Sequence, residues 1–271
     1  MSCCCPTPLS NGTPAGSSTG GTSRIVSVEY DFADQGTIVL ADGPQLIVDT
    51  DGNAISVTVG NVAAAATYRF LQGTGLQFIA NASNTVYNSA TQSASFLEWT
   101  FANLFATYGI DSTYDILARI YLTTQTFTQN QVTGFLTLAL RGVTGSPSNA
   151  ANRQRGILRG QAVGAQIMAH STDSSGGQNY VITALGPPNV YGIRHEQGAM
   201  AAFAGTWGGS FDDTQCTLDV GDQPATSPNT SGYRDTTMVL GLGFGTGGVT
   251  ATMQVTVERM RLDFRATQAA A

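Results

Sequence analysis

Carboxylate pairs that could cleave a glycan are scarce in this sequence. Hydrolysis of a glycosidic bond uses two carboxyl groups that flank the bond. The chain contains four glutamates: Glu29, Glu98, Glu196 and Glu258. Glu98 stands beside Trp99 and Glu196 follows His195, so Glu98 and Glu196 form the only pair that we consider. With no tight E-x-D-x-E cluster on one predicted strand, glycan cleavage stays an alternative, and we expect a protein that is not an enzyme.

Other catalytic and cofactor patterns are incomplete. The two histidines, His170 and His195, have no G-x-S-x-G motif with which to build a Ser-His-Asp system. A formal G-x-G-x-x-G runs from Gly243 to Gly248, but the residues after it alternate like a strand. A dinucleotide site would need a helix at that point. We therefore expect no cofactor.

Calcium is the metal that the sequence favours. Asp212, Asp213, Asp219 and Asp222 form a dense carboxylate group on predicted loops, where β-sandwiches hold structural calcium. Solvated turn aspartates are the simpler interpretation, and structural calcium is the alternative to it. A zinc site is not expected, because the chain has two histidines and no C-x-x-C pair.

Candidate binding residues fall into two groups. Partner-binding candidates are a basic patch and a cysteine cluster: Arg153, Arg155, Arg159, Cys3, Cys4 and Cys5. A basic patch on an acidic protein can dock on an acidic neighbour, although a solvated loop is the simpler explanation. Trp207 and Tyr191 are candidate glycan-binding residues, because exposed aromatic rings can stack on sugars, whereas core packing is the usual role of such rings.

Composition narrows the class of protein. Only 11% of the 271 residues are charged, the net charge is −6, and every basic residue is Arg. The acidic balance argues against nucleic-acid binding, and no run approaches 18 apolar residues, so we expect no membrane span. Residues 1–23 contain three Pro and four Gly with few apolar side chains. We expect them to form a disordered arm without a secretory signal.

The elements that must position these residues are short strands. We expect a small β-hairpin region over residues 24–61, turning at Asp51-Gly52, and a β-sandwich domain over residues 62–271. About ten strands separated by Gly, Ser, Asn and Asp turns indicate an all-β antiparallel sandwich or jelly roll. Residues 96–108 fit either a short helix or a buried strand followed by a turn. The final strand changes phase near Glu258, which predicts a bulge or a bend between sheets.

The sandwich region resembles the concanavalin/laminin-G-like family. The resemblance lies in the segments YRFLQGTGLQFIA, STYDILARIYLTT, GFLTLALRG and VERMRLDF, between Tyr68 and Phe264. It implies a domain that binds glycans, decorates particles or serves as a module of a larger assembly. It transfers no ligand residues, because no family motif is present.

The arm, the Lys-free composition and the single sandwich together resemble virion proteins of tailed phages. This resemblance implies a structural protein on the outside of the particle, most simply a capsid decoration (cement) protein that docks through its arm. A tail-fibre or baseplate protein that recognises host glycans is the alternative. The expected partners are other virion proteins, further copies of the chain and a host glycan. The expected location is the virion surface after synthesis in the host cytoplasm.

Overall fold

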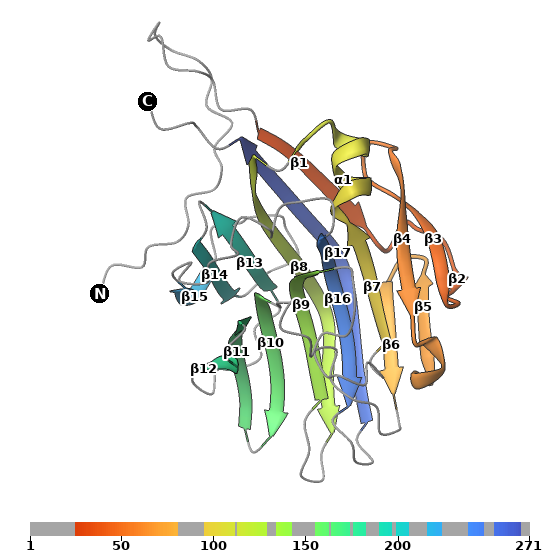
Figure 1. The fold of residues 1–271 in the computed structure, drawn as a ribbon. Helices are drawn as coiled ribbons and strands as arrows, with labels where there is room; N and C mark the ends of the chain where they lie inside the picture. The colour runs from red at the N-terminus through yellow and green to blue at the C-terminus, as the bar shows by residue number, and fades with distance from the viewer. Residues whose placement is uncertain are drawn as a thin grey trace, which may run out of the picture.

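The chain folds into two antiparallel β-sheets packed face to face, with one short helix at one end (Figure 1). The computed structural model describes residues 25–80, 95–111, 113–128, 134–142, 155–162, 164–173, 176–182, 190–196, 199–205, 216–223, 238–246 and 252–266. The all-β antiparallel sandwich predicted from the sequence is confirmed.

Sheet A has nine strands in the order β15-β14-β13-β8-β17-β6-β5-β2, and β1 also pairs with β17. Its strands are β1 (Ile25–Asp31), β2 (Ile38–Val39), β5 (Thr67–Leu71), β6 (Gly75–Ala80), β8 (Tyr114–Thr128), β13 (Val190–Glu196), β14 (Ala199–Gly205), β15 (Cys216–Gln223) and β17 (Thr252–Ala266).

Sheet B has eight strands in the order β12-β11-β10-β9-β16-β7-β4-β3. Its strands are β3 (Gly43–Val48), β4 (Ala54–Gly60), β7 (Ser95–Thr100), β9 (Gly134–Gly142), β10 (Arg155–Ala162), β11 (Gly164–Asp173), β12 (Gly176–Ile182) and β16 (Met238–Thr246). A single 3₁₀ turn, η1 (Val62–Ala64), and the helix α1 (Phe101–Tyr108) complete the described elements.

Aromatic side chains fill the space between the sheets at the end where β1 lies. The Tyr30 ring centroid is 5.7 Å from that of Trp99, and the Phe32 centroid is 5.6 Å from that of Phe70. All four side chains are fully buried. Aromatic rings of this size contribute much of the buried apolar area of a core, and their contacts with each other add further stability. Trp99 is therefore a core residue.

The first strands belong to the sandwich itself. The sequence predicts a separate hairpin region over residues 24–61, but β1 pairs with β17 and β4 pairs with β7. Val28 and Tyr30 of β1 share one hydrophobic core with Leu262 of β17. The boundary expected between residues 61 and 62 is therefore not a domain boundary.

The hairpin that joins β3 to β4 confirms the turn predicted at Asp51-Gly52. The Asp49 carbonyl accepts a hydrogen bond from the Gly52 N–H at 3.0 Å, and Gly52 adopts the left-handed φ of 88°. A type I turn followed by a left-handed glycine is the common three-residue hairpin loop. The Asp49 carboxylate accepts hydrogen bonds from the backbone N–H groups of Asp51 and Asn53, which explains the clustered polar residues without a metal.

The stretch from Phe96 to Tyr108 contains both elements that its sequence allowed. β7 ends at Thr100, whose side-chain oxygen accepts from the Asn103 N–H at 3.2 Å and so caps α1. Gly109, with a φ of 60°, ends the helix. In the described part of the chain no helix is both long and apolar enough to span a membrane.

A bulge interrupts β17 where the sequence predicted it. The pairing of β17 with β8 shifts register around Val257 and resumes at Arg259, leaving Glu258 out of the ladder. One edge of β17 pairs with β8 along its length. The other edge pairs with β6 before the bulge and with β1 after it. The bulge therefore marks the point where β17 exchanges one neighbouring strand for another.

Candidate functional site

A charged cluster lies on the outer face of sheet A where β1 meets β17. Outward-facing Glu29 and Asp31 alternate along β1 with the buried Val28 and Tyr30. The register places Asp31 opposite Arg259. The pairing of the strands thus brings acidic side chains of β1 beside a basic side chain of β17.

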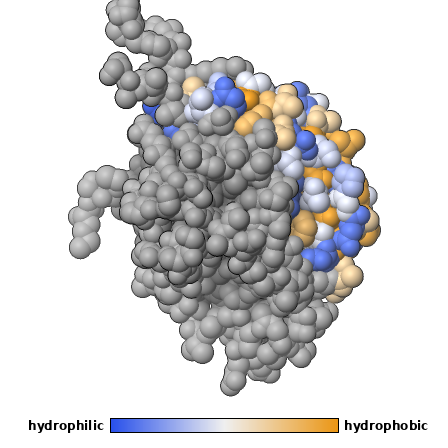
Figure 2. Space-filling model, viewed as in Figure 1, coloured by the Kyte–Doolittle hydropathy of each residue, from blue (hydrophilic) through white to orange (hydrophobic). Residues whose placement is uncertain are grey.

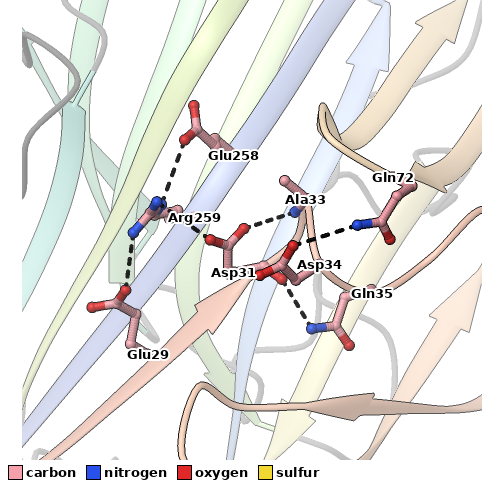
Figure 3. Close-up of polar contacts among 8 residues, drawn as sticks. All are labelled: Glu29, Asp31, Ala33, Asp34, Gln35, Gln72, Glu258 and Arg259. Atoms are coloured by element: carbon pink, nitrogen blue, oxygen red, sulfur yellow. Dashed lines mark hydrogen bonds and ion pairs between the residues drawn. The ribbon is translucent and has the colours of Figure 1, made fainter.

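Arg259 is the centre of this cluster (Figure 3). Its guanidinium nitrogens lie 3.3 Å from a Glu29 carboxylate oxygen, 3.3 Å from an Asp31 oxygen and 3.5 Å from a Glu258 oxygen. The four side chains are between 15% and 29% exposed, so water reaches them partially. One arginine thereby connects both strands to the bulge residue.

Partial burial affects the ionisation of Glu29. Burial raises the pKa of Glu29 above its ordinary value, while the positive charges of Arg259 and Arg261 oppose that rise. Removing a carboxylate from water disfavours its charged form, and neighbouring cations favour that form. Glu29 therefore binds its proton more tightly than it would in the unfolded chain.

The cluster continues into the loop after β1. The Asp31 carboxylate accepts a hydrogen bond from the Ala33 N–H at 2.9 Å, and the Gln35 side chain donates to the Asp31 carbonyl at 2.9 Å. Gln72 donates to the Asp34 carboxylate at 3.4 Å. These bonds fix the path from β1 toward β2 and connect it to the turn between β5 and β6 (Figure 3).

A second polar group lies deeper on the same face. The Arg119 guanidinium of β8 forms an ion pair with the Asp263 carboxylate of β17, and their side chains are 6% and 1% exposed. Ser27 of β1 donates to Asp263 at 2.6 Å, and Arg261 donates to it at 3.2 Å. Asp263 therefore joins three neighbouring strands through one carboxylate.

These two groups connect β1, β17 and β8 through ion pairs and hydrogen bonds, and together we call them the clamp. Each acidic side chain of the two groups lies within ion-pair distance of an arginine, except that Asp34 is held by Gln72. Among the residues that the structure describes, no group of three or more His, Cys, Asp or Glu could hold a metal ion. The arrangement neutralises charge and fixes the order of β1, β17 and β8.

Most of the sequence-predicted binding residues lie outside this clamp. Outside the described residues lie Cys3, Cys4, Cys5, Arg153, Trp207, Asp212 and Asp213. Arg155 and Arg159 stand on β10 opposite Leu140 and Leu136 of β9. Asp219 and Asp222 stand on β15. The partner-binding and calcium assignments therefore stay predictions.

Tyr191 does not fit its predicted glycan-binding role. It lies on β13, is 1% exposed and belongs to the main hydrophobic core. A ring that packs between the sheets cannot stack on a sugar from solvent. Tyr191 was singled out as an aromatic ring that could stack on a sugar if it were exposed, but its side chain packs in the core.

The two glutamates considered for glycan cleavage lie on different sheets. Glu98 lies on β7 of sheet B and is 5% exposed, whereas Glu196 ends β13 of sheet A. Sequence reasoning passed over the E-x-D spacing of Glu29 and Asp31. Its signal is the match between two acidic residues on β1 and two basic residues, Arg259 and Arg261, on β17.

Among the comparisons with known proteins, only the one with solved structures found similar proteins. No protein-family model matches the chain, and no curated protein does. A family 7 alginate lyase shares 9% identity, with 90% of this chain and 94% of that chain covered and a TM-score of 0.43. The CBM2 module of the evolved Dit protein of Lactobacillus casei BL23 phage J-1 shares 10% identity, with 92% and 99% covered and a TM-score of 0.40.

A pseudo β-1,3-glucanase and immunostimulatory antigen of Mycobacterium tuberculosis shares 13% identity, with 86% of this chain and 96% of that chain covered and a TM-score of 0.39. TM-scores this low transfer no ligand, partner or activity to this chain. The assignment of the sandwich rests on the strand pairing described above.

These likenesses do correct one expectation. The sequence led us to expect a protein that is not an enzyme, yet several of the similar structures are glycan-active enzymes, including alginate lyase and a GH43 protein of Bacillus licheniformis. The exclusion of enzymatic activity is therefore wrong as a conclusion from the sequence. The incomplete catalytic motifs that supported it were sought in one strand or one loop.

Proposed function

We propose that this chain is a structural protein on the outside of a phage particle, a capsid decoration protein that docks through residues 1–23. The observation that supports this proposal is the clamp on β1. The strand that follows the arm is held on β17 by seven register pairs from Ile25↔Arg265 to Asp31↔Arg259. It is also held by the Ser27–Asp263 hydrogen bond and the Arg259 ion pairs.

A clamp at this position suits a docking arm. Force applied to residues 1–23 passes into β1, which lies beside the longest pairing of sheet A, between β17 and β8. A pull along β1 shears all of its ladder hydrogen bonds together and does not unzip them singly. The low charge of the chain, 11% charged residues, also suits a surface that packs in a stable assembly.

Particle incorporation tests the proposal. We would compare the full chain with a variant lacking residues 1–23 and with a variant whose arm has the same composition in scrambled order. We expect both variants to have the same free energy of unfolding as the full chain, and to be missing from purified particles. Substituting Cys3, Cys4 and Cys5 by Ser, and separately Arg153, Arg155 and Arg159 by Gln, assigns docking to either group of predicted residues.

Quantitative mass spectrometry of the particles supplies the readout. A copy number comparable with that of the major capsid protein supports a decoration protein. A copy number comparable with that of tail components favours the tail-fibre or baseplate alternative, and a glycan-binding assay is then the next measurement. Normal occupancy of the arm-deleted variant, or absence of the full chain from particles, would overturn the proposal.

A further inference from the structure

β3 is an edge strand of sheet B. It pairs with β4 on one side, from Gly43↔Val59 to Val48↔Ala54, and ends the strand order of its sheet. The hairpin fixes which backbone groups face the open side. The Asp49 N–H donates to the Asn53 carbonyl at 3.0 Å and so points toward β4. Because backbone groups alternate along a strand, those of Val48, Leu46 and Pro44 point away from β4.

The contacts of Val48 agree with this alternation. The Val48 N–H donates to the side-chain oxygen of Gln35 at 2.9 Å, and the Gln35 side-chain nitrogen donates to the Val48 carbonyl at 2.8 Å. The amide of Gln35 thus occupies the edge as a residue of a neighbouring strand would. It covers one position of the edge with a single, displaceable side chain.

The rest of the β3 edge has few features that would prevent another strand from pairing with it. Pro44 has no N–H, which is a common device on edge strands, but β3 carries no charged side chain in GPQLIV. Leu46 stands between Pro44 and Val48, and its carbonyl accepts one hydrogen bond from the Gln45 side chain at 3.0 Å. The Leu46 and Val48 side chains are 64% and 41% exposed. Hydrophobic surface is visible on the side of the molecule where β2 and β3 lie (Figure 2).

We propose that two copies of this chain associate by pairing their β3 strands antiparallel, around a two-fold axis at Leu46. The spacing of the edge residues fits this symmetry. Each Leu46 donates its N–H to, and accepts from, the Leu46 of the second copy, which is the hydrogen-bonded type of antiparallel pair. Pro44 then lies opposite Val48 of the second copy.

The missing N–H of Pro44 and the Gln35 amide bound at Val48 are compatible with each other in this arrangement. The Val48 N–H, once released from the Gln35 oxygen, donates to the Pro44 carbonyl of the second copy. Pro44 has no N–H to give to the Val48 carbonyl, which keeps the Gln35 nitrogen as its donor. Since β3 is uncharged, self-pairing brings no like charges together, and Leu46 meets Leu46 while Val48 meets Pro44. A second copy of the chain therefore fits this edge better than a charged strand would.

Sedimentation equilibrium of the full chain at several concentrations tests the pairing. We expect a reversible dimer whose dissociation constant falls at least about tenfold in Gln35→Ala, because the competing amide is removed from both edges. Leu46→Lys places two positive charges against each other at the two-fold axis and should leave a monomer. Val39→Lys makes the same change at a side chain that is 76% exposed on β2, and it should associate like the unmodified chain.

Circular dichroism of each variant checks that the fold is kept, as expected at the exposed Leu46 and Val39 and at the partly buried Gln35. Dimerisation that Leu46→Lys weakens and Val39→Lys does not supports the proposal. Dimerisation seen only in Gln35→Ala and abolished by adding Leu46→Lys also supports it. Monomers at every concentration in both the unmodified chain and Gln35→Ala would overturn it. So would a dimer that survives Leu46→Lys.

Discussion

Gly75 approaches Val257 so closely that a methyl group on Gly75 would lie 2.4 Å from the Val257 carbonyl oxygen. The same methyl group would lie 3.0 Å from the Glu258 Cα, and the φ of Gly75 is 122°. This contact occurs at the bulge, where β17 exchanges β6 for β1 as its neighbour. The Phe32 N–H donates to the Glu258 carbonyl at 2.8 Å on the other side of that junction.

Gly75→Ala should therefore destabilise the sandwich by more than backbone strain alone. Gly43→Ala is a matched control, since Gly43 has the same φ of 122° and no atom within 4 Å of the added methyl group. We expect each substitution to lose about 1–3 kcal/mol from its φ. Gly75→Ala should lose a further 1–3 kcal/mol or so from overpacking. Urea unfolding of both variants measures the difference, and equal losses would contradict the close approach.

The buried ion pair should matter more than the half-buried one. Asp263→Asn leaves the Arg119 charge without its partner carboxylate in a site where both side chains are under 7% exposed. We expect a loss of about 3–5 kcal/mol in the free energy of unfolding. Glu29→Gln removes a carboxylate that is 25% exposed, and it should cost at most about 1 kcal/mol.

Chemical denaturation of the two variants checks this order. The double variant Arg119→Met/Asp263→Leu is the control, because replacing both charges by apolar groups should recover most of the loss. If Asp263→Asn proved no more harmful than Glu29→Gln, Asp263 would not be the residue that joins β1, β17 and β8.

Glu29 should give the stability of the protein a recognisable pH dependence. Its pKa in the folded chain is raised by burial, so the folded state binds more protons than the unfolded state just above the ordinary value of 4.5. That contribution is fully present below the unfolded pKa and is lost as the pH rises through the folded pKa. Relative to Glu29→Gln, the unmodified chain should become less stable as the pH rises across this window.

Asp111 supplies a control of opposite sign. Hydrogen bonds from the Thr113 side chain and backbone lower the pKa of Asp111, so its contribution is present above the unfolded pKa and is lost as the pH falls. Relative to Asp111→Asn, the unmodified chain should lose stability toward acid. Unfolding free energies between about pH 3 and pH 7 test both signs. Two difference curves with the same slope would refute the assignment for one of the two residues.

Local sequence patterns predicted the local elements well. The turn chemistry located the hairpin at Asp51-Gly52, and the phase change near Glu258 indicated the bulge. Each of these signals lies within a few residues of the feature that it predicts, so a single sequence contains enough information to find it.

The predictions that failed depend on distant pairing. Nothing near β1 indicates that its partner is β17, so the charges of Glu29 and Arg259 could not be joined and residues 24–61 looked like a separate unit. Likewise the inward orientation of Tyr191 depends on the register of β13 with β8, where Tyr191 lies opposite the buried Ile120. Register between distant strands is a property of the packed sheets, and composition does not reveal it.

The pairing of β1 with β17 has a consequence for how the protein is made. Ser27 and Asp263, which meet in the folded chain, are 236 positions apart. During translation β1 leaves the ribosome early and must stay without its partner until β17 has been synthesised. Since β17 also pairs with β8 and β6, sheet A cannot close before then. The sandwich is therefore expected to stay incomplete until β17 has been synthesised, with apolar strands exposed in the meantime to chaperones and to neighbouring nascent chains.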